Sequence, residues 1–107
     1  MRYVFDLDGT LCTLTDGFYE NARPHVNRIE KVNKLFEAGH HITIYTARGM
    51  SRYRNDSQKS HVLFEELTRN QLINWCVKFH DLFLGKPAGD VYIDDKAIND
   101  NDYFRDN

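Results

Sequence analysis

The sequence lacks the features that would point to several other classes of protein. Its 107 residues include 14 Lys and Arg against 16 Asp and Glu, for a formal net charge of -2. There is no basic excess of the kind that nucleic-acid binding needs. No apolar run is long enough to cross a bilayer, and the N-terminus has no signal-peptide pattern. We therefore expect a protein that binds neither nucleic acid nor a membrane.

Cysteine is also scarce. Cys12 and Cys76 lie far apart and match no metal-binding or redox spacing. Two free thiols are typical of a reducing compartment, so we expect a cytoplasmic location. The length is close to the commonest domain size and allows a core without disulfides, so residues 1–107 are predicted to form a single domain.

What the sequence does contain is an alternation of strand-like and helix-like segments. Strands are predicted at 2–7, 41–46, 81–84 and 91–93. Pro24 and Gly39 bracket one predicted helix, and a capping box at Thr68 and Gln71 predicts another that continues to about Val77. Residues 8–23 are predicted to form a polar loop or small flap. Residues 47–60 are predicted to form a loop that enters a helix, with helical character continuing through Val62, Leu63 and Leu67. Strands separated by helices predict an α/β fold, a Rossmann-like three-layer arrangement with helices on both faces of a parallel sheet.

Polar side chains follow each predicted strand at its C-terminal end. They are Asp6 and Asp8, Thr46, Lys86, and Asp94 with Asp95. Each has a simpler explanation when taken alone, such as a solvated turn, a helix cap or a surface lysine. The C-terminal ends of parallel strands share one rim, where ligands bind in open α/β sheets. Polar residues at the ends of all four predicted strands therefore favour a common site.

These side-chain types together suit phosphoryl transfer. Two carboxylates one residue apart repel each other, and a hard cation such as Mg²⁺ with oxygen ligands offsets the repulsion. A lysine and a hydroxyl can hold the charged phosphoryl oxygens. One carboxylate can accept the phosphoryl group as an aspartyl phosphate, and another can act as general acid and base.

Four motifs resemble those of the haloacid dehalogenase (HAD) superfamily. They are FDLDGT at 5–10, IYT at 44–46, GKP at 85–87 and IDD at 93–95. The resemblance implies a minimal core with Asp6 as nucleophile and Asp8 as general acid/base. It also implies that Thr46 and Lys86 hold the phosphoryl oxygens. Mg²⁺ would then be bound by Asp6, Asp8, Asp94 and Asp95, with Asp8 contributing its backbone carbonyl.

A narrower resemblance concerns the substrate. The segments TARGM at 46–50, GKP at 85–87 and IDDKA at 93–97 are similar to those of a capless subgroup linked to capsule and surface-polysaccharide biosynthesis. This implies a small phosphorylated substrate, a phosphosugar monoester. The residues predicted to contact it are Gly9, Thr10, Ala47 and Arg48. Arg52 and Arg54 are more typical of a solvated surface. The motif gaps are too short for a cap, which leaves open whether the flap or a second copy closes the site.

The same residue types also occur in two other kinds of protein. A phosphate-accepting receiver domain also uses strand-end Asp, Thr and Lys-Pro residues, although in a different order along the chain. A noncatalytic Mg²⁺-binding module would keep the same acidic residues. Repeated hydrolysis of phosphate esters separates the phosphatase from both.

Overall fold

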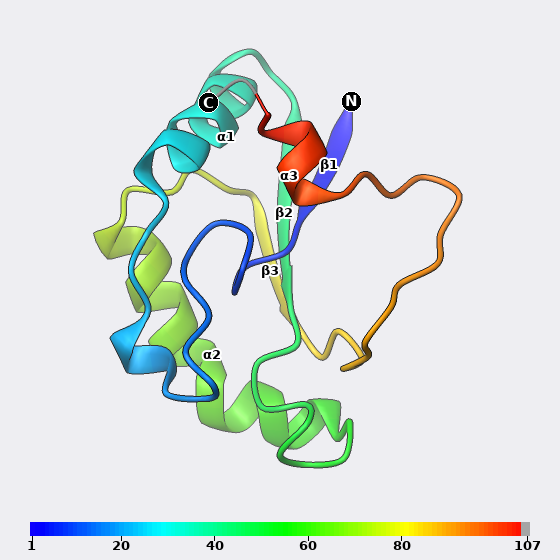
Figure 1. Ribbon diagram of the computed structural model, residues 1–107. Helices are drawn as coiled ribbons and strands as arrows, with labels where there is room; N and C mark the ends of the chain where they lie inside the picture. Colours follow the sequence, from blue (N-terminus) through cyan, green and yellow to red (C-terminus); the bar gives the residue numbers. More distant parts are fainter. Residues whose placement is uncertain (106–107) are drawn as a thin grey trace.

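Three short parallel strands form the centre of the protein (Figure 1). The computed structural model describes residues 1–105, in which β1 spans Arg2–Phe5, β2 His41–Thr46 and β3 Asp81–Leu84. The order in the sheet is β1-β2-β3. These three strands are confirmed, with β1 ending two residues earlier than the sequence predicts.

The first long helix has the predicted position. Helix α1 spans Val26–Glu37, just after Pro24, and buries Ile29 and Val32 against the sheet. The chain leaves it through Gly39, whose φ of +95° is the left-handed conformation that commonly ends a helix. Before α1, the loop after β1 contains only a short 3-10 turn, η1 at Tyr19–Asn21.

Helix α2, at Ser57–Asn74, joins the helical segment predicted through Leu67 to the helix predicted from Thr68. It follows Asp56, whose side chain accepts a hydrogen bond from the Lys59 amide (3.1 Å) and caps the helix. The helix start predicted at Thr68 is therefore wrong. Thr68 is fully buried inside α2, where its hydroxyl accepts a hydrogen bond from Arg48. Polar residues on the buried side of α2 interrupt the apolar periodicity that would have indicated one continuous helix.

Helices α1 and α2 lie on the same side of the sheet (Figure 1). Both crossovers step in one direction, from β1 to β2 to β3, and right-handed connections then place both helices on one face. Val4 and Phe83 point to the other face and are 64% and 55% exposed. The α/β class and the parallel sheet are confirmed, and no cap domain is evident among residues 1–105. The cover predicted on both faces is present on only one in this part of the chain.

The fourth strand, predicted at 91–93, is wrong. Residues 85–99 form an excursion without regular structure (Figure 1, orange). Tyr92 folds back on this segment. Its hydroxyl donates to the Pro87 carbonyl (2.6 Å) and accepts from the Gly89 amide (3.2 Å). Because β1 pairs only with β2 among residues 1–105, its second edge is unpaired there.

The end of the described chain returns to the core. Helix α3 spans Asp100–Tyr103, and the following Phe104 is 4% exposed. Its ring lies 6.0 Å from that of Phe5 in β1. Phe104 therefore anchors this end of the described chain to the sheet.

Candidate active site

The chain turns sharply after β1, and the carbonyl of Leu7 organises the turn. It accepts hydrogen bonds from the amides of Thr10 (3.0 Å) and Leu11 (2.8 Å). Gly9 has a φ of +85°, a conformation that favours glycine. Leu7 is fully buried between Asp6 and Asp8. The turn therefore fixes the backbone of both acids, and their side chains reach different partners.

Asp6 lies beside the lysine at the end of β3. Lys86 Nζ is 3.3 Å from one carboxylate oxygen of Asp6, and the Thr10 hydroxyl donates to the other at 3.1 Å. Burial raises the pKa of Asp6, which outweighs the lowering by the Lys86 charge and by the Thr10 hydrogen bond. The Asp6 side chain is still 33% exposed and that of Lys86 21%, so a ligand can reach both.

Backbone contacts bring the end of β2 to the same place. The Lys86 amide donates to the Thr46 carbonyl at 3.1 Å. The buried hydroxyl oxygen of Thr46 accepts from the Arg48 amide at 3.2 Å, so it keeps its own proton to donate. Asp6, Thr46 and Lys86 thus occupy the ends of three adjacent strands, as the sequence predicts. Ala47, the next residue after β2, is half-buried.

Asp8 is held by a buried arginine. Arg48 Nε donates to one carboxylate oxygen at 2.9 Å, and Nη2 donates to the other at 3.0 Å. The Cys12 thiol also donates to Asp8 at 3.4 Å. Burial, followed by the Asp8 charge, raises the pKa of Cys12 to about 12, so the thiol stays protonated. Asp8 is therefore fixed in position by two side chains.

The sequence predicts that Arg48 faces the rim, but its side chain points into the protein instead. Its side chain is 0% exposed and lies between Asp8 and helix α2, where Nη1 donates to Thr68 and Gln71. Its guanidinium lies 4.9 Å from the centre of the Tyr19 ring. A buried guanidinium needs such partners, because an unpaired charge in the interior is very costly. Arg48 thus contacts Asp8 rather than an incoming substrate.

Asp94 and Asp95 do not join the other acids. Both are exposed on the 85–99 excursion, and the Asp94 carboxylate accepts a hydrogen bond from the Lys96 amide at 3.0 Å. That bond is the main reason for the lowered pKa of Asp94. Among residues 1–105 no group of three His, Cys, Asp or Glu side chains is close enough to hold a metal ion. In this arrangement the predicted Mg²⁺ ligand set does not fit the ion.

Arg28 adjoins the site, although it belongs to none of the sequence motifs. It reaches from α1 to the loop after β1, where Nη1 donates to the Thr10 carbonyl at 3.1 Å. The same nitrogen pairs with Asp100 at 2.7 Å, and Nη2 donates to Asn101 at 3.0 Å. A signal was present, because Arg28 shares a helical face with the buried Val32, four residues along. A charged residue on the apolar face of a helix indicates that its side chain has a partner inside the protein.

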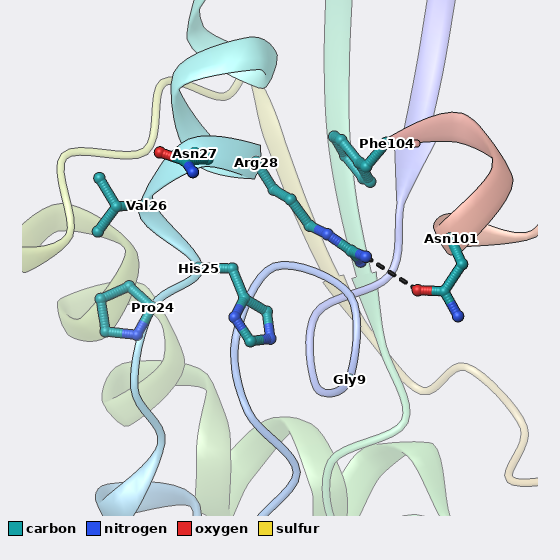
Figure 2. Close-up of a pocket in the computed structure, with 8 residues that line it drawn as sticks. All are labelled: Gly9, Pro24, His25, Val26, Asn27, Arg28, Asn101 and Phe104. Atoms are coloured by element: carbon teal, nitrogen blue, oxygen red, sulfur yellow. Dashed lines mark hydrogen bonds between the residues drawn. The ribbon is translucent and has the colours of Figure 1, made fainter. Parts of the chain in front are cut away.

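A cleft of about 530 Å³ opens next to this arginine (Figure 2). It is lined by Gly9, Pro24, His25, Val26, Asn27, Arg28, Asn101 and Phe104. Figure 2 shows Arg28 extending from α1 to Asn101 on α3, while His25 points toward the loop that carries Gly9. The cleft therefore adjoins the turn that positions Asp6 and Asp8.

Comparisons with known proteins agree with this architecture. A family model described as haloacid dehalogenase-like hydrolase matches residues 3–66, more than half of the chain. The chain belongs to this family. A crystal structure of a target protein from Vibrio cholerae superposes with a TM-score of 0.87 and 28% identity, covering 95% of this chain and 85% of the other. A search of curated proteins gave no match.

Family membership supports hydrolase chemistry at the rim of the sheet. The matched region begins at Tyr3 and ends at Glu66, so it includes the turn with Asp6 and Asp8 and also Thr46. Lys86 lies beyond the matched region and enters the site through its contacts with Asp6 and Thr46. No helix among residues 1–105 has the length and apolar character needed to span a membrane.

Proposed function

We propose that this haloacid dehalogenase-like hydrolase cleaves phosphomonoesters with Asp6 as the nucleophile. The observation that carries the proposal is the 3.3 Å contact between Asp6 and Lys86, which come from the ends of two strands separated by β2. A carboxylate and a fixed cation meet there at a partly exposed point. The lysine can hold an anionic phosphoryl group in reach of the carboxylate oxygen.

The proposed reaction has two steps. An Asp6 oxygen attacks phosphorus, the bond to the leaving oxygen breaks, and an aspartyl phosphate forms. Water then attacks the same phosphorus, the bond to Asp6 breaks, and inorganic phosphate leaves. The Lys86 ammonium and the Thr46 hydroxyl stabilise charge on the phosphoryl oxygens in both steps.

Asp8 is the proposed general acid/base. Arg48 holds both of its carboxylate oxygens, which positions Asp8 for activation of water in the second step. Protonation of an alcohol in the first step needs the neutral acid, so the pair has to open for poor leaving groups. Leaving groups that depart as stable anions avoid this requirement.

Mg²⁺ is the proposed cofactor, since members of the superfamily generally use it. Asp6 and the backbone carbonyl of Asp8 are its proposed ligands at the rim, and Asp94 and Asp95 would join them only in another arrangement of the 85–99 segment. The last two lie outside the site in the arrangement described above, so none of the steps above depends on the ion. The cofactor would supply positive charge to the phosphoryl oxygens when bound.

The proposed substrate is a phosphosugar of surface-polysaccharide biosynthesis. The support is the resemblance of the segments 46–50 and 93–97 to the subgroup linked to that process. The absence of an evident cap among residues 1–105 is consistent with an open site for such a substrate.

The proposal is tested by hydrolysis of p-nitrophenyl phosphate. Asp6→Asn is expected to lower kcat by on the order of a thousand-fold or more, because removing a nucleophile removes the covalent route. Asp90→Asn, on the exposed 85–99 segment, is the matched control and should retain full activity. Full activity in Asp6→Asn would show that another residue is the nucleophile.

The Asp8–Arg48 pair favours a second candidate function, that of a phosphate acceptor. If Arg48 never releases Asp8, the aspartyl phosphate would persist, as in a signalling receiver. The same assay separates the two functions, because an acceptor gives a single burst of about one product per protein molecule and no further turnover.

A further inference from the structure

We propose that the cleft between α1 and α3 binds the leaving group of the phosphomonoester, as an uncharged, hydroxyl-bearing group such as a sugar ring. This rests on the proposed function and adds the subsite that selects the substrate. The lining residues that would recognise the group are His25, Asn27 and Asn101.

The first argument is continuity with the reacting carboxylate. Gly9, in the catalytic turn, lines one side of the cleft. Arg28, which lines another, donates to the Thr10 carbonyl at 3.1 Å, and the Thr10 hydroxyl donates to Asp6 at 3.1 Å. Two hydrogen bonds, from Arg28 to Thr10 and from Thr10 to Asp6, thus connect the cleft to the carboxylate. A group attached to a phosphoryl oxygen at Asp6 can extend into it.

The second argument concerns charge. Arg28 is the cation of the cleft, and Asp100 already neutralises it at 2.7 Å. Its guanidinium also lies over the Phe104 ring, 4.8 Å from the centroid. No further acid or base of fixed charge is among the lining residues. A second phosphate or a carboxylate would meet no unpaired cation there, whereas a neutral polar group would bury no unpaired charge.

The third argument is the supply of polar contacts. Among the residues drawn in Figure 2, the hydrogen bond present joins Arg28 and Asn101. The His25 ring and the Asn27 amide have no partner within that set, and both groups can donate and accept. The side chains of Pro24 and Val26 add an apolar surface. The volume of about 530 Å³ is within the usual range for small-molecule sites.

Calorimetric binding to the Asp6→Asn protein tests the subsite without turnover. The probes are inorganic phosphate and a panel of hexose 1- and 6-phosphates. Adding Asn27→Trp places a ring at the cleft and should weaken the best hexose phosphate at least ten-fold, while phosphate affinity changes less than two-fold. Lys34→Trp, seven residues along the same exposed side of α1, is the matched control and should change neither affinity.

His25→Ala is the second variant, and it should also weaken the hexose phosphate selectively. The proposal is overturned if no hexose phosphate binds the Asp6→Asn protein more tightly than phosphate does. It is equally overturned if Asn27→Trp and His25→Ala leave the hexose phosphate unaffected, or weaken both ligands to the same extent. Hydrolysis of p-nitrophenyl phosphate by the unaltered chain tests the proposed function separately, so the two failures are distinguishable.

Discussion

Asp6 and Asp8, in the turn after β1, are held in different ways although one residue separates them. Asp6 is paired with a lysine that is itself partly exposed, and burial raises its pKa. Both carboxylate oxygens of Asp8 accept hydrogen bonds from one edge of a buried guanidinium. The first pair is partly exposed, so a ligand can reach it, whereas the second fixes the Asp8 side chain in place. This division matches a nucleophile and a positioned acid/base.

The raised pKa of Asp6 predicts that its ionised carboxylate lowers the stability of the folded protein. Because its folded pKa lies above the unfolded one, ionised Asp6 disfavours the folded state at neutral pH, and the cost disappears as the pH falls below the unfolded value. Asp6→Asn should therefore unfold at a higher temperature than the parent at pH 7. The gain should shrink toward zero near pH 3.

Thermal unfolding followed by circular dichroism across this pH range measures the difference. Asp90→Asn is exposed and serves as the control, which should show no pH-dependent gain. An Asp6→Asn protein less stable than the parent at pH 7 would mean that the Lys86 pair outweighs burial.

Sequence motifs located the residues of the rim but not all of their partners. Asp6, Thr46 and Lys86 follow apolar strands, and strand direction alone places them together. Arg48 follows a strand as well, yet it turns inward to Asp8 because Thr68 and Gln71 offer acceptors on a helix that is distant in sequence. Side-chain direction after a strand depends on such long-range partners, which spacing does not reveal.

At the scale of elements, α2 is attached to the site through Arg48. Thr68 and Gln71 accept from its guanidinium, and the buried Ser60 hydroxyl donates to its carbonyl. Gln71 also donates to the Tyr19 carbonyl at 2.7 Å, which ties the flap to the same helix. The pair with Asp8 is therefore part of the packing of α2 against the loop after β1.

Replacing Arg48 should loosen this packing. Arg48→Met leaves Asp8 and the α2 acceptors without their donor and is expected to destabilise the fold by about 3 kcal/mol. Arg52→Met removes an exposed arginine from the same loop and should change stability by less than about 0.5 kcal/mol. Urea unfolding of both variants measures the free energies. Equal stability of the two variants would show that the buried pair contributes little.

The same polar contacts explain which elements the sequence predicted poorly. The apolar stripe of α1 is regular, so its position was predicted from Pro24 to Gly39. Ser60 and Thr68 occupy buried positions of α2 and break its stripe. The segment 91–93 has strand-like composition, but Tyr92 bonds locally to Pro87 and Gly89 instead. The composition of 91–93 favours a strand, but it does not determine whether the segment pairs with the edge of the sheet.

In the molecule as a whole, an unpaired edge and an exposed apolar segment occur together. β1 has one free side among residues 1–105, and Val91 and Ile93 are 75% and 95% exposed. An unpaired strand edge can accept another strand, and burial of exposed apolar side chains is stabilising. Pairing of this segment with β1 would satisfy the edge, bury apolar surface, and carry Asp94 and Asp95 toward the rim. Mg²⁺ binding by these acids would favour that pairing.

Hydrogen exchange tests this coupling. Without metal, the amides of 91–95 should exchange rapidly, since this stretch has no regular structure. Saturating Mg²⁺ should slow their exchange at least ten-fold, because the acids gain a cation and the segment gains backbone partners. The double variant Asp94→Asn/Asp95→Asn should lose this protection, whereas Asp90→Asn should keep it. If Mg²⁺ stimulates hydrolysis while exchange of 91–95 stays fast, the ion binds at the rim without the acidic pair, and its ligands have to be sought around Asp6 and Asp8 alone.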